Sequence, residues 1–243
     1  MTYPKFKNKH LENAFFGANI LKEENKINNL PNKFVIIYSK KILNHFKTKY
    51  FAKRIFKHEL FEIYKHKTIG LIWMKGIGSP HAVAVIENII SAGGKEFLNI
   101  GCAGGLQHEG IFLCTKALRD EGTSYHYTSH GHFSFPDKEL TKKLGESIKK
   151  SELDYEEGAT WTIDAPYRET KAEVEHYKKQ GIKTVEMESS ALFTLAKIKT
   201  VKIASAFIVS DTLYGERKKF HKKAWFMNSF KQLFDAAVEC LLA

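Results

Sequence analysis

The chain has 243 residues, of which 43% are hydrophobic, and a formal net charge of +11 at neutral pH. This length and composition fit one large domain that buries a substantial core. Its longest apolar run, Ile203 to Val209, is too short to cross a bilayer, and no secretory signal is apparent. Three cysteines without paired spacing argue against disulfides or a metal site and predict a cytoplasmic protein. Because the lysines are scattered, the charge favours a basic solvated surface over a nucleic-acid partner.

The first third of the sequence predicts an arm followed by strands and a helix. Residues 1–30 are polar and rich in lysine and asparagine, so they are expected to form an N-terminal arm. The apolar residues 34–38 predict a buried strand, and the basic stretch 40–56 predicts a helix. Two more strands are expected at residues 61–64 and 69–74, separated by a Lys-His-Lys turn.

A glycine-bearing turn, Gly76 to Pro80, leads from these strands into an apolar helix. Ser79 is the expected N-cap of this helix, and Pro80 is its expected first residue. A short strand over residues 97–100 then runs into a second glycine turn, Gly101 to Gly105. A strand, a helix and a strand within about thirty residues form a crossover unit, which implies parallel strands.

Strands and helices continue to alternate through the rest of the chain. Strands are expected at residues 111–117, 160–163 and 201–209, and helices at residues 140–150, 171–180, 187–196 and 225–242. Neither an internal repeat nor a linker divides the sequence. We therefore predict an α/β fold with one domain over residues 31–243, in which helices flank a mixed, largely parallel sheet.

Three polar segments follow predicted strands, namely the two glycine turns and the pair Ser210-Asp211. Ligands of open α/β sheets collect outside the carboxyl ends of the strands, so these segments are expected to converge on one crevice. Backbone N–H groups of the glycine turns, with a helix start behind the first, can face an oxyanion. Cys102, in the second turn, has no base paired with it in the sequence, so small-residue packing is the better interpretation.

Carboxylates occur at two separate places, each beside an apolar segment. Val185-Glu186-Met187-Glu188-Ser189 opens a buried helix, and Asp211 follows an almost entirely apolar strand. Such a pair suits a reaction that develops positive charge on a sugar and must deliver a proton to a leaving base. Glu186 and Glu188 point in different directions on a helix, so one can face the ligand while the other supports the helix dipole. Capping of the next segment is the alternative role for Asp211.

Two loops, Arg119–Tyr127 and Thr162–Thr170, combine polar and aromatic residues in a way that suits substrate recognition. Tyr167 and Arg168 in the second loop can stack on a flat base or donate hydrogen bonds to it. For any one residue of these loops, a structural role is equally open.

In order and spacing, these segments resemble the nucleoside phosphorylase superfamily, which includes purine nucleoside phosphorylases, uridine phosphorylases and related nucleosidases. The resemblance covers about residues 69–242 and is carried by Gly76–Pro80, Asn99–Leu106, Arg119–Ser124, Thr162–Thr170, Val185–Ser189 and Ser210-Asp211. It implies an enzyme without a metal or other cofactor, whose small-molecule partners are a nucleoside and phosphate. It also implies a homo-oligomer, which would be a dimer, trimer or hexamer.

The resemblance implies roles for individual residues. Glu188 would hold the ribose hydroxyls, and Asp211 would protonate a purine ring nitrogen, which favours a purine substrate. Together with the composition of the loops, it predicts that the nucleoside is bound by Val185, Glu186, Met187, Pro166, Tyr167, Arg168 and Ser210. The residues predicted to bind phosphate are Gly78, Ser79, Cys102 and Arg119.

The chain departs from the family's phosphorolytic members where they bind phosphate. Tyr38-Ser39-Lys40-Lys41 replaces a glycine-aspartate-proline-x-arginine turn, Asn99 replaces a strand arginine, and Cys102 replaces a serine or threonine. Anion affinity rests heavily on such cations. Either water is the nucleophile, or phosphate is held by other groups such as Ser79, Arg119, Lys40 or a neighbour's Arg54.

We predict a nucleoside phosphorylase that releases a free base and ribose 1-phosphate. The alternatives are a phosphate-independent nucleosidase, a uridine-specific phosphorylase and an inactive protein that only binds nucleosides.

Overall fold

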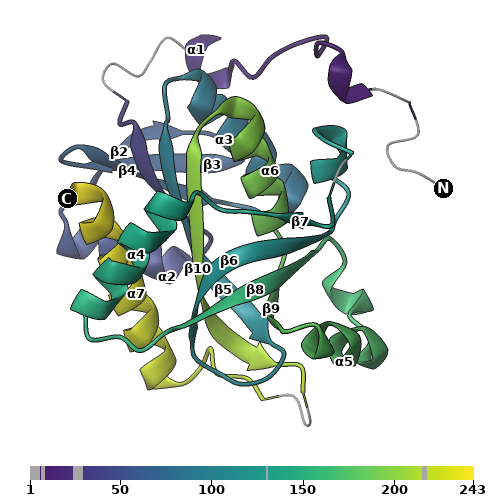
Figure 1. Ribbon diagram of the computed structural model, residues 1–243. Coiled ribbons are helices and arrows are strands. Elements are labelled where there is room, and N and C mark those ends of the chain that lie inside the picture. Colours follow the sequence, from purple (N-terminus) through teal and green to yellow (C-terminus); the bar gives the residue numbers. More distant parts are fainter. Residues whose placement is uncertain (1–5, 7–8, 24–29, 130, 215–217) are drawn as a thin grey trace.

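The computed structural model describes residues 6, 9–23, 30–129, 131–214 and 218–243. Before β1, the described helix α1 lies beside α3 (Figure 1), where the Ile20 N–H donates to Asn88 Oδ1 at 2.8 Å. In chain order the elements are η1 (Lys9–Leu11), α1 (Ile20–Glu23), β1 (Lys33–Ile37), α2 (Lys40–Lys49), β2 (Lys53–Lys57), β3 (Phe61–His66), β4 (Ile69–Met74), α3 (Ser79–Ser91), β5 (Glu96–Gly105), β6 (Ile111–Asp120), η2 (Ser124–His126), β7 (Phe133–Ser134), α4 (Lys138–Lys150), β8 (Glu156–Ile163), η3 (Pro166–Arg168), α5 (Lys171–Lys179), β9 (Ile182–Glu186), α6 (Ser189–Lys199), β10 (Lys202–Thr212) and α7 (Ala224–Leu242).

In the described part of the chain, the strands form one mixed sheet of ten strands. Their order is β10-β6-β8-β9-β5-β1-β4-β3-β2, and β7 pairs with β6. Because β10 also pairs with β5, the strands β10, β6, β8, β9 and β5 close into a ring, from which β1 to β4 extend as an open sheet. The predicted α/β fold, a mixed sheet flanked by helices, is therefore confirmed.

Parallel pairing sets the position of the site. β1 runs parallel to both β4 and β5, and β5 runs parallel to β10. The helix α3 connects β4 to β5, as the predicted crossover unit requires. The carboxyl ends of four strands therefore meet at one edge of the sheet, where ligands of α/β proteins collect.

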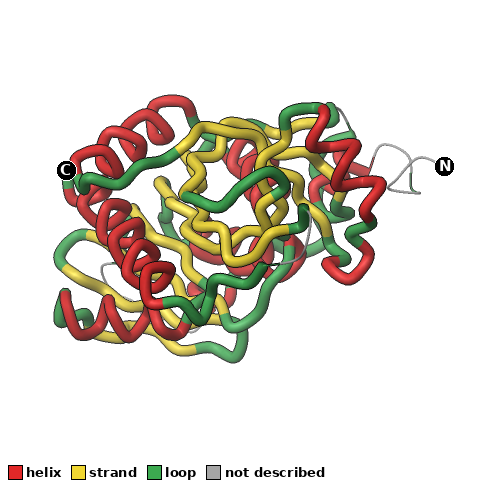
Figure 2. Tube along the Cα trace, turned by 90° about the horizontal axis from the view of Figure 1, so that it is seen from below, coloured by secondary structure: helices red, strands yellow, loops and turns green. Residues whose placement is uncertain are grey.

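Helices cover both faces of this sheet (Figure 2). On one face α2, α4 and α7 bury a cluster that contains Phe46, Phe230 and Phe234. On the other face α3 and α6 pack over a second cluster that contains Phe34 and Phe97, whose stacked rings lie 5.7 Å apart. Burial of large apolar side chains on both faces explains why the central strands read as continuous hydrophobic runs.

The predicted helix over residues 40–56 is wrong in its second half. The helix α2 ends at Lys49, and Phe51 has a φ of 50°, a left-handed conformation that interrupts a helix. Residues 53–57 form β2, which pairs with β3 in antiparallel fashion at the edge of the sheet. Three of the five residues of β2 are exposed, so an apolar pattern did not mark it as a strand.

The glycine segments also differ from the predicted turns. The strand β5 continues to Gly105, paired with β10 and β9, so residues 101–105 are not a turn. Gly78, with a φ of 96° that favours glycine, takes the N-cap of α3 in place of Ser79. The Ser79 hydroxyl donates instead to the Met187 carbonyl oxygen at 2.7 Å. The helix predicted from residue 187 begins at Ser189.

Candidate active site

A cavity of about 720 Å³ lies at the carboxyl ends of β1, β5, β9 and β10. Its volume falls in the range of sites that enclose a small molecule. It is lined by Tyr38, Ser39, Ile77, Asn99, Gly101, Cys102, Ala103, Gly104, Pro166, Tyr167, Glu169, Val185, Glu186, Met187, Glu188, Phe207, Ser210, Asp211, Leu213 and Phe230. The segments expected to converge thus contribute to one cavity, and the loop after β8 joins them.

Most of the predicted site residues line this cavity. They are Cys102, Pro166, Tyr167, Val185, Glu186, Met187, Glu188, Ser210 and Asp211. Gly78 and Ser79 lie behind the lining, where they hold Glu188 and Met187 in place. The structure does not bring the remaining two, Arg119 and Arg168, into the cavity wall.

Glu188 is a nearly buried carboxyl group at the junction between β9 and α6. The backbone N–H of Gly78 donates to its Oε1 at 2.5 Å, so the start of α3 fixes one of its oxygens. Burial, and secondarily the charge of Glu186, raises the pKa of Glu188 to about 8. A positive charge that develops beside this carboxyl would favour its ionised form, which is how it can stabilise a cationic sugar.

Glu186 serves the fold of the site with both of its carboxylate oxygens. Thr162 donates to Oε1 at 2.5 Å, and the backbone N–H groups of Glu188 and Ser189 donate to Oε2 at 2.9 and 2.8 Å. Burial raises the pKa of Glu186, while these hydrogen bonds act in the opposite direction. The carboxylate therefore lies where an anion is favoured at a helix start, and it fixes the turn that carries Glu188.

Ser210 and Asp211 are adjacent residues of β10, yet both line the cavity. Neighbouring side chains of a regular strand point to opposite faces. Here the pairing of β10 with β5 shifts register between Val209 and Asp211, and this bulge re-aims the two side chains. The Ser210 hydroxyl donates to Asp211 Oδ1 at 2.9 Å, so the two polar groups form one unit in the wall.

Tyr38 and Asn99 form a neutral polar pair in the wall, and the site prediction had not included them. The Tyr38 hydroxyl donates to Asn99 Oδ1 at 3.1 Å. Asn99 Nδ2 in turn donates to Ser205 Oγ at 3.3 Å and to Ser189 Oγ at 3.5 Å. Burial, followed by the charges of Glu188 and Glu186, raises the pKa of Tyr38, so its hydroxyl stays neutral.

Cys102 faces the same cavity as a neutral thiol. Burial, with a smaller contribution from Asp211, raises the pKa of Cys102 to about 12. A thiol with such a pKa is not a nucleophile near neutrality. Although the cavity walls enclose it, Cys102 is exposed to the cavity, so it lines the site as a neutral thiol, and the structure does not show the small-residue packing that the sequence suggested.

Arg119 holds the loop that follows β6. Its guanidinium donates to Ser124 Oγ at 2.8 Å, to the Gly131 carbonyl at 3.0 Å and to the Thr128 carbonyl at 2.7 Å. It also lies 4.1 Å from the ring centre of Tyr125. These contacts give this buried cation a structural role within its own loop.

Arg168 lines a different, open pocket of about 490 Å³ together with acidic residues. The pocket is lined by Asp120, Ile163, Asp164, Ala165, Arg168, Thr170 and Glu173. The turn η3 separates it from the cavity, because Pro166 and Tyr167 of the same turn line the cavity itself.

Several lining residues had no sequence signal of their own. Phe207 is a buried residue in the middle of β10, and Phe230 is a buried residue of the C-terminal helix α7. Only the tertiary packing of α7 against the sheet brings Phe230 to the site. Tyr38 could have been predicted as a site residue, because it directly follows β1 and ligands bind at the carboxyl ends of such strands.

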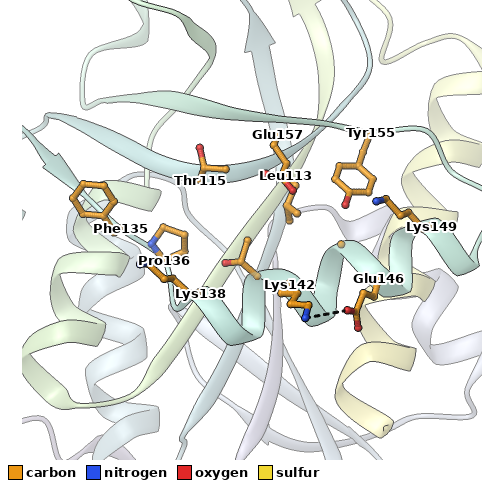
Figure 3. A pocket seen from close by; sticks show the side chains of 12 residues that line it. Leu113, Thr115, Phe135, Pro136, Lys138, Lys142, Glu146, Lys149, Tyr155 and Glu157 are labelled. Carbon is orange, nitrogen blue, oxygen red and sulfur yellow. Dashed lines mark ion pairs between the residues drawn. The ribbon is translucent and has the colours of Figure 1, made fainter.

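A second large groove, of about 510 Å³, lies between α4 and the strands β6 and β8 (Figure 3). Figure 3 shows Leu113, Thr115 and Glu157 on the strand side of the groove. Charged side chains lie along α4, where Lys142 and Glu146 form an ion pair at 3.9 Å. None of the predicted site residues lines this groove. The candidate chemistry therefore belongs to the cavity around Glu188.

Within the residues that the structure describes, none of the helices combines the length and the apolar character needed to span a bilayer. The same residues contain no group of three or more His, Cys, Asp or Glu side chains that could hold a metal ion.

Comparison with known proteins places the chain in a family. The model of the phosphorylase superfamily matches residues 37–243. Guanosine phosphorylase from Halorubrum lacusprofundi is 27% identical over 148 residues, which are 59% of this chain and 61% of that protein. The match thus spans less than two thirds of this relative's length.

Solved structures show the same fold. AMP nucleosidase from Bacteroides thetaiotaomicron superposes with a TM-score of 0.74 at 19% identity, over 88% of this chain and 90% of that chain. Uridine phosphorylase from Vibrio fischeri gives a TM-score of 0.74 at 20% identity, over 90% and 91% of the two chains. Because the family model covers most of the sequence, this chain belongs to the phosphorylase superfamily.

Proposed function

We propose that this protein cleaves the N-glycosidic bond of a nucleoside in the cavity around Glu188. The observation that carries the proposal is the pair of carboxyl groups, Glu188 at the start of α6 and Asp211 near the end of β10, which line one cavity. Membership of the phosphorylase superfamily supports this assignment. An inactive nucleoside-binding protein is the rival from another class.

The proposed chemistry divides between the two carboxyl groups. Glu188 contacts the ribose and stabilises the positive charge that develops as the bond from C1′ to the base nitrogen breaks. The bonding electron pair leaves with the base, and Asp211 supports its departure by holding or delivering a proton at a ring nitrogen. The apolar wall formed by Val185, Pro166 and Phe207 excludes water from the base, which strengthens both electrostatic interactions.

We favour a purine base, because Asp211 offers a carboxyl group to a ring nitrogen. Tyr167, whose side chain is fully exposed at the cavity wall, supplies a ring on which a base can stack. The names of the related proteins include both guanosine and uridine phosphorylases, so a uridine-specific enzyme is the second candidate.

Two acceptors of the ribose group, inorganic phosphate and water, are compatible with the family. The name of the guanosine relative favours inorganic phosphate, with ribose 1-phosphate as the second product. The structural likeness to an AMP nucleosidase keeps hydrolysis as the alternative.

The proposal includes a cytoplasmic homo-oligomer. The described chain contains three free cysteines, and a reducing compartment such as the cytoplasm keeps cysteines in this thiol form. Ile77 and Tyr167, at the cavity wall, are 64% and 99% exposed, which suits coverage by a second copy. Light scattering would give a mass that is a multiple of 27.8 kDa.

Base release from inosine, guanosine, adenosine and uridine tests the function. We expect at least one of them to be cleaved, and we expect Glu188→Ala and Asp211→Asn each to lower turnover at least tenfold, about the smallest loss typical of such groups. Glu175→Ala, on the exposed face of α5, is the control variant and should leave the rate unchanged. Folded Glu188 and Asp211 variants with wild-type rates would refute the assigned roles. Tight nucleoside binding without any base release would favour the inactive binding protein.

A further inference from the structure

Two residues at the start of α3 hold the turn that carries Glu188, although neither of them lines the cavity. The backbone N–H of Gly78 donates to Glu188 Oε1 at 2.5 Å, and the Ser79 hydroxyl donates to the Met187 carbonyl oxygen at 2.7 Å. Two consecutive residues thus bind two consecutive residues, and we call this pair of hydrogen bonds the α3 clamp. Bonds at adjacent points fix the orientation of a turn as well as its distance.

The clamp depends on the way in which the start of α6 is capped. Glu188 is the N-cap residue of this helix, but its side chain makes no capping hydrogen bond. Glu186 accepts from the N–H groups of Glu188 and Ser189 in its place. The Glu188 carboxyl group therefore accepts from Gly78, whose φ of 96° is a conformation that favours glycine.

Ser79 takes part in the clamp through its hydroxyl group. The residue is fully buried, and its single hydroxyl proton is directed at the Met187 carbonyl oxygen. Without this hydroxyl, the Gly78 bond would be the only member of the clamp, and the turn would be free to rotate about it. Ser79 thus acts on the cavity through the main chain that carries Met187 and Glu188.

The clamp favours the ionised form of Glu188. Burial raises the pKa of this carboxyl group to about 8, the charge of Glu186 adds to the rise, and the hydrogen bond from Gly78 opposes it. Loss of that bond would raise the pKa further, because a donor stabilises a carboxylate more than a neutral carboxyl group. The ionised fraction near neutrality would then fall.

We propose that Ser79 is a positioning residue for the cleavage reaction: its bond to Met187 keeps the Gly78 N–H against Glu188 and so maintains the ionised form of that carboxyl group. This inference rests on the proposed function, in which the ionised carboxyl group stabilises the cationic sugar. It assigns a role to a side chain outside the cavity lining.

Several other titratable groups surround Glu188. Those that interact with it or line the cavity with it are Tyr38, Cys102, Asp164, Glu169, Glu186 and Asp211. In the first turn of α3, burial lowers the pKa of His81, so its imidazole is uncharged above neutrality. The Ser79 hydroxyl bonds to a main-chain carbonyl oxygen and to none of these side chains. A shift of the pH profile after substitution of Ser79 therefore reports on the clamp.

The pH dependence of base release tests the proposal. For the wild type and Ser79→Ala, kcat/KM is measured from about pH 6 to about pH 9.5 with the nucleoside that is cleaved fastest. The wild-type midpoint is expected at about 8. In the variant we expect a midpoint about 0.5–1 pH unit higher, a rate roughly three- to tenfold lower at about pH 7, and agreement within about twofold at about pH 9.5.

Two results with Ser79→Ala would overturn the proposal. The first is an unchanged midpoint. The second is a loss of the same size at every pH, because it would reveal damage to the fold without an effect on the ionisation of Glu188.

Ser147→Ala is the matched control. The Ser147 hydroxyl also donates to a main-chain carbonyl oxygen, that of Ala236, at 2.7 Å, and it joins α4 to α7 outside the cavity lining. This variant loses the same kind of bond, so its Tm should fall, whereas its midpoint and its rate near neutrality should match those of the wild type. A midpoint shift equal to that of Ser79→Ala would show that the profile reports general loosening of the fold, against the proposal.

Direct titration of Glu188 separates this proposal from the proposed function. Carbon NMR of protein labelled in its glutamate side chains follows the carboxyl group, whose signal is identified by its absence in Glu188→Gln. We expect a higher pKa in Ser79→Ala than in the wild type, whether or not a nucleoside is cleaved. Equal pKa values would overturn the positioning role and leave the proposed function intact. Absence of base release from every nucleoside would contradict the proposed function, and the titration would still decide whether the clamp acts on Glu188.

A second variant covers the case in which Ser79→Ala does not fold. Ser79→Cys keeps the shape of the side chain and replaces the hydroxyl with a weaker donor. It should raise the pKa of Glu188 in the same direction, and an unchanged pKa in this variant would equally overturn the proposal.

Discussion

Two glutamates separated by one residue have different roles in this protein. Glu186 accepts three hydrogen bonds from the chain and fixes the start of α6. Glu188 accepts one at Oε1 from Gly78 and lines the cavity with the rest of its carboxyl group. Their spacing predicted that one would face the ligand and the other would support the helix, but not which one. The difference arises from Thr162 on β8, a partner that only the folded sheet brings close.

The raised pKa of Glu188 predicts a pH dependence. A carboxyl group with a pKa of about 8 is neutral at lower pH, so the ionised form that stabilises a cationic sugar becomes more abundant as the pH rises. For the preferred nucleoside, kcat/KM should therefore increase from pH 6.5 toward pH 8.5 and level off above about 8. The profile is measured in buffers of constant ionic strength. A profile that is flat, or highest at the acidic end, would show that the neutral form of Glu188 is sufficient.

The location of single residues at the cavity was predictable where chemistry and chain position agreed, and their roles there remain predictions. Glu188 was singled out because it lies where a buried helix was predicted to begin, and Asp211 because it follows a predicted apolar strand. Arg119 and Arg168 were expected at the ligand because of their side-chain type, which says nothing about direction. In the structure the first faces its own loop and the second faces a neighbouring pocket.

At the level of elements, the long apolar helices and strands were predictable from the sequence, whereas the polar strand at the edge of the sheet was not. β1, β4 and α7 lie close to their predicted positions because each buries an apolar face. The edge strand β2 was missed because it buries little. The glycines of β5 were assigned to a turn by composition, although pairing with β9 and β10 on both sides keeps this segment in the sheet.

The glycines at the end of β5 allow close approach of neighbouring chain segments. A Cβ at Gly105 would lie 2.6 Å from the His108 carbonyl oxygen, which belongs to the backbone and cannot rotate away. Gly105→Ala should therefore cost about 1–3 kcal/mol of unfolding free energy. This corresponds to roughly 2–4 °C in Tm per kcal/mol for a chain of this size, measured by thermal denaturation.

Gly101→Ala is the control for this substitution. A Cβ there would meet Tyr38 ring carbon at 3.7 Å, an ordinary contact, so its Tm should stay close to that of the wild type. Equal Tm values for the two variants would show that close packing at Gly105 does not limit stability.

For the whole molecule, the sequence predicted the convergence of its motifs but not the character of the resulting cavity. Ligands of α/β proteins bind at the carboxyl ends of the parallel strands, and this rule correctly placed segments between residues 38 and 211 at one edge of the sheet. The closed ring of β10, β6, β8, β9 and β5, and the position of Phe230 in the wall, depend on tertiary pairing that periodicity does not encode.

The central claim is that a nucleoside lies in this cavity with its ribose against Glu188. A crystal structure with a nucleoside analogue whose glycosidic bond resists cleavage tests it most directly. We predict ribose hydroxyls within about 2.6–3.2 Å of the Glu188 carboxyl group and a base ring nitrogen at the same distance from Asp211. An empty cavity at saturating analogue, or a ribose bound away from Glu188, would contradict the claim.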